Sequence, residues 1–124
     1  MLSLVRIPES ARDLLDLGEQ ALRVLAARPG YVRGRLARST DPGGGWALVT
    51  EWESVGAWRR ALSSYDVKVH ATPLLALAVD ESSAYEVLLA VQADGSAERF
   101  GSDRLDAPRL RGAAAPGRER SNGL

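Results

Sequence analysis

The sequence contains no cysteine and a single histidine. Without cysteine, the chain cannot form disulfides, use a thiol nucleophile or bind a metal through sulfur. With His70 alone, a metal site built from several histidines of one chain is also excluded. No run of alternating Asp or Asn resembles a calcium-binding loop. We therefore expect no metal site.

The sequence also lacks net charge and long apolar runs. Sixteen Lys and Arg residues balance sixteen Asp and Glu residues, so the chain has no overall field that would attract nucleic acid or a membrane surface. No apolar run approaches the roughly 18–20 residues that span a bilayer. The first residues lack the regions of a secretory signal. We expect a cytoplasmic protein that binds neither nucleic acid nor membranes.

What is present is enough for one small domain. The chain has 124 residues, of which 45% are hydrophobic, as in ordinary globular proteins. From Ala93 onward the sequence is rich in Gly, Pro, Arg and Ser and has a single aromatic residue. We therefore predict one domain over residues 1–92 and a disordered tail over residues 93–124.

Hydrophobic periodicity predicts the elements of this domain. Alternation favours strands at 2–7, 31–39, 46–53 and 84–92. Helical spacing favours helices over 8–30 and 54–64, and a further helical piece over 66–80 that is interrupted near Pro73. The strands at 31–39 and 46–53 are joined by the turn sequence TDPGGG, which predicts a hairpin.

The order βαββαβ is typical of a ferredoxin-like α+β fold with an antiparallel sheet. Two helices cover only one face of such a sheet. Several strands nevertheless carry apolar residues on both faces, so the second face needs a partner. We predict a homodimer in which two sheets pack together.

The predicted helices have defined apolar faces. In the first helix, Ser10 and Asp13 form a possible N-cap pair, and close packing is expected against Gly18. Its apolar face comprises Leu14, Leu15, Gly18, Ala21, Leu22 and Leu25. In the second helix, Ser54 is the predicted N-cap, and the inner stripe is Trp58, Leu62 and Tyr65. The third piece has a possible face of Val67, His70, Leu74 and Leu77.

Residues 48–70 hold the side chains best suited to chemistry. His70 has an ordinary pKa near neutrality, so it is a candidate base for a phenol. Tyr65 is a candidate hydrogen-bond donor, and Trp52 and Trp58 are candidate walls for a flat substrate. Each also has a structural interpretation, because the aromatic residues would fill a core and a lone histidine is often only hydrogen-bonded. Arg35 faces either a cavity, where it would stabilise an anion, or solvent.

The sequence resembles the antibiotic biosynthesis monooxygenase (ABM) domain family over roughly residues 2–92. The matching features are "PGY" at the start of the second strand, "WES" at the end of the third, and an aromatic-rich helix directly afterwards. The resemblance implies a dimeric α+β barrel with an apolar cavity. It further implies oxidation of an aromatic, polyketide-like or quinonoid small molecule with O2, without a cofactor.

Residue by residue, the resemblance is partial. The strand-end tryptophan of these oxygenases matches Trp52, and the aromatic residue six positions later matches Trp58. Leu48 replaces an asparagine that those enzymes direct at the substrate, which favours the alternative of a non-catalytic small-molecule-binding or interaction module. Haem degradation is less favoured, because its tryptophan position falls nearest Ala61 and His70 is about one residue out of register.

Overall fold

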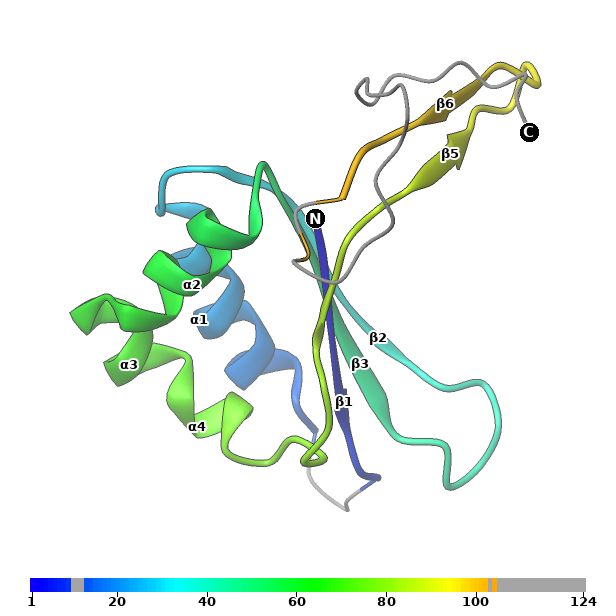
Figure 1. Ribbon diagram of the computed structural model, residues 1–124. Coiled ribbons are helices and arrows are strands. Elements are labelled where there is room, and N and C mark those ends of the chain that lie inside the picture. The colour runs from blue at the N-terminus through cyan, green and yellow to red at the C-terminus, as the bar shows by residue number, and fades with distance from the viewer. Residues whose placement is uncertain (10–12, 103, 105–124) are drawn as a thin grey trace. The chain divides into compact units, whose positions relative to one another are not determined.

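The computed structural model describes residues 1–9, 13–102 and 104 (Figure 1). The chain divides into two compact units, an N-terminal unit of Met1–Tyr85 and a C-terminal unit from Glu86 onward. The N-terminal unit contains the elements β1 (Leu2–Ile7), α1 (Leu15–Ala26), β2 (Tyr31–Arg38), β3 (Trp46–Trp52), α2 (Val55–Ser63), α3 (Tyr65–His70), α4 (Thr72–Leu75) and β4 (Ala84–Tyr85).

The four strands form one antiparallel sheet in the order β2-β3-β1-β4. All the helices lie on one face of this sheet (Figure 1). The predicted ferredoxin-like α+β fold is therefore confirmed. The predicted dimer is a separate matter, and it stays a prediction.

The central strand β3 shows the predicted alternation at every position. Trp46, Leu48, Thr50 and Trp52 are buried on the helix-covered face, while Ala47, Val49 and Glu51 are half-buried on the other face. A strand in the middle of a sheet with one covered face must separate its residues in this way.

Strand β2 departs from simple alternation at its start. The pairing with β3 shifts between Tyr31, which lies opposite Trp52, and Arg33, which lies opposite Glu51. Because this irregularity inserts an extra residue, Tyr31 packs against the core together with Leu36, and Val32 is exposed. Tyr31 and Leu36 therefore both contact the core, whereas strict alternation along 31–39 would place them on opposite faces.

Helix α1 buries most of its predicted apolar face. Gly18, Ala21 and Leu25 are buried, whereas Leu15 is exposed and does not belong to the face. A Cβ atom at Gly18 would lie 2.5 Å from the Leu36 Cδ2 atom, so the expected close packing is confirmed. Of the predicted cap pair, Asp13 accepts a hydrogen bond from the Leu15 N–H at 2.9 Å, and Ser10 lies outside the described residues.

Helix α2 begins as predicted and ends earlier. The Ser54 hydroxyl accepts a hydrogen bond from the Ala57 N–H at 3.0 Å, which confirms the N-cap. The backbone then becomes extended at Ser64, with ψ of 149°, and the Ser64 hydroxyl caps the next helix. Tyr65 therefore starts a new helix and is 78% exposed. Its predicted place in the stripe of Trp58 and Leu62 is wrong.

Helices α3 and α4 replace the single piece expected over 66–80. Val67 and Leu74 are buried as predicted, but His70 and Leu77 are exposed and Ala71 is buried in their place. Val67, Ala71 and Leu74 follow each other at i, i+4 and i+7, so the buried face passes through Ala71 and leaves His70 on the exposed side, although α3 ends at His70 and Pro73 begins the next short helix. None of the helices in the described part of the chain is long and apolar enough to cross a membrane.

The strand expected over 84–92 is wrong in extent. Strand β4 ends at Tyr85, and the C-terminal unit contains a separate hairpin of β5 (Leu89–Val91) and β6 (Ala97–Arg99). Its turn contains Asp94-Gly95, in which Gly95 has a φ of 89°. The expectation of a tail without regular structure is therefore wrong for 97–99. Residues 105–124 lie outside the described residues.

Candidate functional site

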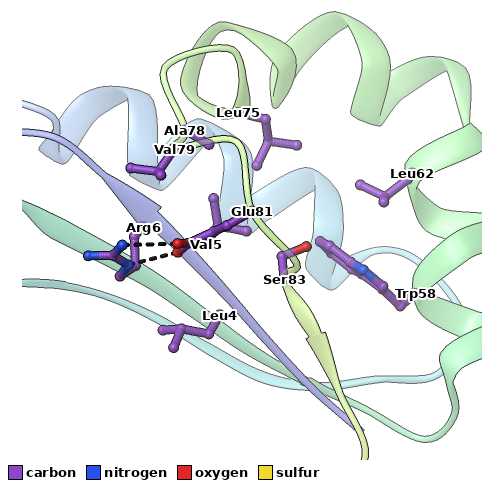
Figure 2. Close-up of a pocket in the computed structure, with 10 residues that line it drawn as sticks. All are labelled: Leu4, Val5, Arg6, Trp58, Leu62, Leu75, Ala78, Val79, Glu81 and Ser83. Atoms are coloured by element: carbon purple, nitrogen blue, oxygen red, sulfur yellow. Dashed lines mark hydrogen bonds and ion pairs between the residues drawn. The ribbon is translucent and has the colours of Figure 1, made fainter.

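The N-terminal unit contains a cavity of about 190 Å³ between its helices and strand β1 (Figure 2). Most of its lining is apolar. The apolar side chains nearest the helices are Trp58, Leu62, Leu75, Ala78 and Val79. The remaining lining residues are Leu4, Val5 and Arg6 of β1, and Glu81 and Ser83 of the segment before β4.

The cavity opens at the edge of β1 because the segment before β4 pairs with that strand only partly. The Val79 N–H donates to the Arg6 carbonyl oxygen at 2.8 Å, and the Leu4 N–H donates to the Ser83 carbonyl oxygen at 2.8 Å. Between these two bonds, residues 80–82 stand opposite Val5 alone. Three residues cannot lie flat against one, so the segment bends away from the strand, as in a β-bulge. We call residues 80–82 the edge bulge.

The two ends of the cavity differ in character. Trp58, only 4% exposed, and Leu62 lie at one end, and the Trp58 ring is 5.5 Å from that of Trp52 between centroids. An ion pair between Arg6 and Glu81 lies at the other end (Figure 2). These two side chains are 56% and 35% exposed. The cavity thus has a closed aromatic end and an accessible charged end.

The Arg6–Glu81 pair is bidentate. The Arg6 Nε and Nη2 atoms donate to the two carboxylate oxygens of Glu81 at 2.7 and 2.9 Å. This hydrogen bonding raises the pKa of Arg6 further and holds the pKa of Glu81 below its usual value. Both groups are therefore charged at neutral pH, and the Arg6 side chain lies on the uncovered face of the sheet, opposite Ala47.

The core behind Trp58 contains two buried hydroxyl groups, those of Thr50 and Ser3. The Trp52 Nε1 atom donates to the Thr50 hydroxyl at 2.8 Å, and Ser3 lies opposite Thr50 in the sheet. The Ser3 hydroxyl is buried and has no hydrogen-bond partner in the described part of the chain. The Trp52 N–H and the Thr50 hydroxyl are thus hydrogen-bonded to each other, whereas the Ser3 hydroxyl is not hydrogen-bonded within the described residues.

Of the six predicted site residues, only Trp58 lines the cavity. Trp52 packs behind it, edge-on to Tyr31 with ring centroids 5.2 Å apart, and Leu48 is buried in the core of the sheet. Both belong to the same aromatic and aliphatic core without reaching the cavity wall. Their predicted substrate contacts stay predictions.

The other three predicted residues lie away from the cavity lining. Tyr65 and His70 are exposed on α3. Arg35 lies on the face of the sheet that the helices leave uncovered, with its Nη2 atom 3.7 Å from the Glu51 carboxylate. The structure therefore does not assemble these three side chains with Trp58 into one site, and the catalytic roles of Tyr65 and His70 and the substrate contact of Arg35 stay predictions.

No pattern in the sequence indicates that Arg6 and Glu81 line the cavity. Arg6 looked like an ordinary outward residue of an alternating strand, and its partner is 75 positions away. No short-range pattern connects two such residues. Within the described ranges, no three His, Asp or Glu side chains come together as a metal site would require.

The comparisons with known proteins agree with this architecture. The family model for antibiotic biosynthesis monooxygenases matches residues 7–72, which is more than half of the chain. The chain belongs to the antibiotic biosynthesis monooxygenase family. The matched part of this ABM protein runs from the end of β1 to the start of α4, and it includes Trp58 but not Glu81.

Two solved structures of one protein show the same fold. The ABM protein is 26% identical to SnoaB, a cofactor-independent oxygenase from Streptomyces nogalater, with a TM-score of 0.53 over 70% of this chain and 92% of that one. A SnoaB variant in which an asparagine is replaced by alanine matches with a TM-score of 0.52 and the same identity and coverage. A conserved protein from Methanosarcina mazei is 14% identical, with a TM-score of 0.46 over 67% of this chain and 85% of that one. No curated protein matches the chain significantly.

Proposed function

We propose that this ABM protein is a cytoplasmic, cofactor-independent oxygenase that oxidises an aromatic or quinonoid small molecule with O2. The observation that carries the proposal is the match to SnoaB, which is a cofactor-independent oxygenase and is covered over 92% of its length. The apolar cavity beside Trp58 supports it, because a flat aromatic ring packs well against an indole.

The proposed reaction needs few functional groups from the protein. A phenolic substrate loses a proton, and its electron-rich anion then gives an electron to O2. One oxygen atom enters the ring as a carbonyl, and the other leaves as water with the hydrogen of the oxidised ring carbon and the proton of the phenol. The apolar lining would exclude water from the reacting ring.

The test is O2 uptake with anthrone- and hydroquinone-type substrates. We expect Trp58→Phe to lower kcat/KM about tenfold, because the aromatic ring of the substrate would lose part of the indole surface against which it packs. Trp46→Phe is the matched control, since Trp46 is also a buried tryptophan but does not line the cavity. Equal losses in the two variants, or no uptake by the wild type, would defeat the proposal.

His70 and Tyr65 need their own comparison. Because both lie outside the cavity lining, we expect His70→Ala and Tyr65→Phe to retain O2 uptake. A loss of tenfold or more in either variant, with normal folding, would restore the catalytic role that the sequence predicts for that residue.

A non-catalytic binding module is the second candidate. Leu48 favours it, because a leucine provides no hydrogen bond where the related oxygenases carry an asparagine. This function predicts saturable binding of an aromatic molecule with no O2 consumption. The same titration and the same oxygen electrode distinguish the two candidates.

We also propose that two copies associate through the uncovered face of the sheet. Leu2, Ala47 and Val49 on this face are half-buried in the single chain, and they would be covered by a second sheet. Light scattering should give the mass of a dimer. Val49→Lys should convert it to a monomer, and a wild-type monomer at micromolar concentration would contradict the proposal.

A further inference from the structure

The cavity is lined from both faces of the sheet. Leu4 and Arg6 of β1 alternate with the buried Val5, so these two side chains lie on the uncovered face. Both residues nevertheless line the cavity, together with Val5 and with residues of the helices. Figure 2 shows Leu4 and Arg6 on one side of β1, and Trp58 and Leu62 on the other.

Only a gap in the sheet can connect its two faces. Toward β3, strand β1 is paired at every position from Leu2 to Ile7, so the sheet is closed there. Toward β4, the edge bulge stands away from the strand at Val5, between the two flanking hydrogen bonds. The cavity therefore passes through the sheet at the edge bulge, and its accessible end lies on the uncovered face.

This end of the cavity is continuous with the surface through which we propose that two copies associate. Leu4 lies directly opposite Val49 in the sheet and is half-buried like it. Because opposite residues on one face have Cβ atoms about 5 Å apart, a second sheet that covers Val49 also covers Leu4. The face carries charges of both signs beside its apolar centre, so a second copy is a complementary partner.

We infer that the second copy forms the outer wall of the cavity, so that the ligand site is complete only in the dimer. This inference rests on the proposed function for the ligand and on the proposed association of two copies. In the single chain, one end of an apolar cavity is open to water. A second sheet excludes that water and adds apolar surface against which an aromatic ring packs. Ligand binding and association therefore favour each other.

Because the chain has no cysteine, one introduced thiol reports whether this end of the cavity is covered. Leu4→Cys and Arg6→Cys each place a thiol there, and Arg6→Cys leaves the packing intact because Arg6 is exposed. We expect iodoacetamide to alkylate both thiols roughly tenfold more slowly in the dimer than in the Val49→Lys background, where the copies are separate. The rates are compared per thiolate, since a nearby lysine lowers the pKa of a thiol. Leu15→Cys on α1 is the control, and its rate should be the same in both backgrounds.

The second measurement is the affinity for 2-naphthol, a neutral aromatic probe, by calorimetry under argon so that no turnover occurs. We expect the wild-type dimer to bind it about tenfold more tightly than Val49→Lys does, which is an ordinary coupling between two sites. By reciprocity, 2-naphthol should strengthen the dimer, and light scattering on dilution measures this. Leu15→Lys adds the same charge outside the proposed interface, and it should keep both the dimer and the affinity.

Equal alkylation rates in the two backgrounds would overturn the inference. So would equal affinities of the wild type and Val49→Lys for 2-naphthol, or no saturable binding to the dimer. A wild-type protein with the mass of a monomer would overturn it together with the proposed association. Failure of the proposed oxygenase function looks different, since O2 uptake would then be absent with every substrate while the protection of the thiols and the difference in affinity remained.

Discussion

The two faces of the four-stranded sheet are built on different principles. The helix-covered face is held by close apolar packing, with Gly18 against Leu36 and Trp52 against Trp58. The uncovered face carries half-buried aliphatic residues beside ion pairs of Arg33 and Arg35 with Glu51. Neighbouring residues of one strand therefore contribute differently to the free energy of unfolding, according to the face on which they lie.

The largest difference is expected between Leu48 and Val49, which are adjacent in β3. Leu48→Ala should lower the free energy of unfolding by about 3 kcal/mol, because it leaves a cavity in the covered core. Val49→Ala should cost about 1 kcal/mol in the monomer. Urea denaturation measures both values, and equal costs at low protein concentration would break the comparison. A cost for Val49→Ala that grows with protein concentration would show that a second copy covers this face.

A difference of intermediate size is expected within the covered face. Thr50→Val should cost about 1–3 kcal/mol, because it leaves the buried Trp52 N–H without its acceptor. Ser3→Ala should cost less than about 1 kcal/mol or stabilise the protein, since the Ser3 hydroxyl has no described partner to lose. Thermal unfolding of the two variants tests this ranking. The opposite order would mean that Ser3 makes a bond that compensates its burial.

The sequence predicts the covered face well because local periodicity determines it. The alternation from Trp46 to Trp52 needs no knowledge of distant residues, and the single helix stripe through Gly18 follows from 3.6-residue spacing. The errors arise where the period is interrupted. The extra residue after Tyr31 and the extended backbone at Ser64 each shift the side chains that follow, and neither has a strong sequence signal.

The candidate site was less predictable than the fold. Trp58 could be found, because helical spacing places it toward the sheet. The Arg6–Glu81 pair depends on how a segment 75 positions away returns to β1, which one sequence does not specify. The hairpin in the C-terminal unit is a different case, since Asp94-Gly95 is a known turn signal. The prediction of a tail relied on composition and did not use this signal.

A small effect is expected on the uncovered face. Glu51→Gln weakens two exposed ion pairs, at 2.9 Å to Arg33 and 3.7 Å to Arg35, and should cost about 0.2–1 kcal/mol. The cost should shrink further in 1 M salt, which screens exposed charges. Denaturation with and without salt checks both points. A salt-independent loss above 2 kcal/mol would indicate that this face is buried by a partner.

The smallest effect concerns pH at the edge of the sheet. Because Arg6 lowers the pKa of Glu81, the pair contributes stability above the usual glutamate pKa of 4.5 and loses it as the pH falls through the lower folded value. An NMR titration of the Glu81 carboxyl should therefore show a midpoint below 4.5. Arg6→Gln should raise that midpoint, and an unchanged midpoint would show that the pair does not persist in solution.

The edge bulge has a consequence for how such a cavity can arise or vanish. Its opening depends on a count of residues, since three positions stand opposite Val5 where regular pairing allows one. Deleting two of them would restore one-to-one pairing and keep every later side chain on its present face. Insertions and deletions of even length at this one place can therefore open or close a ligand site without altering the core, a route to new specificity that point substitutions do not offer.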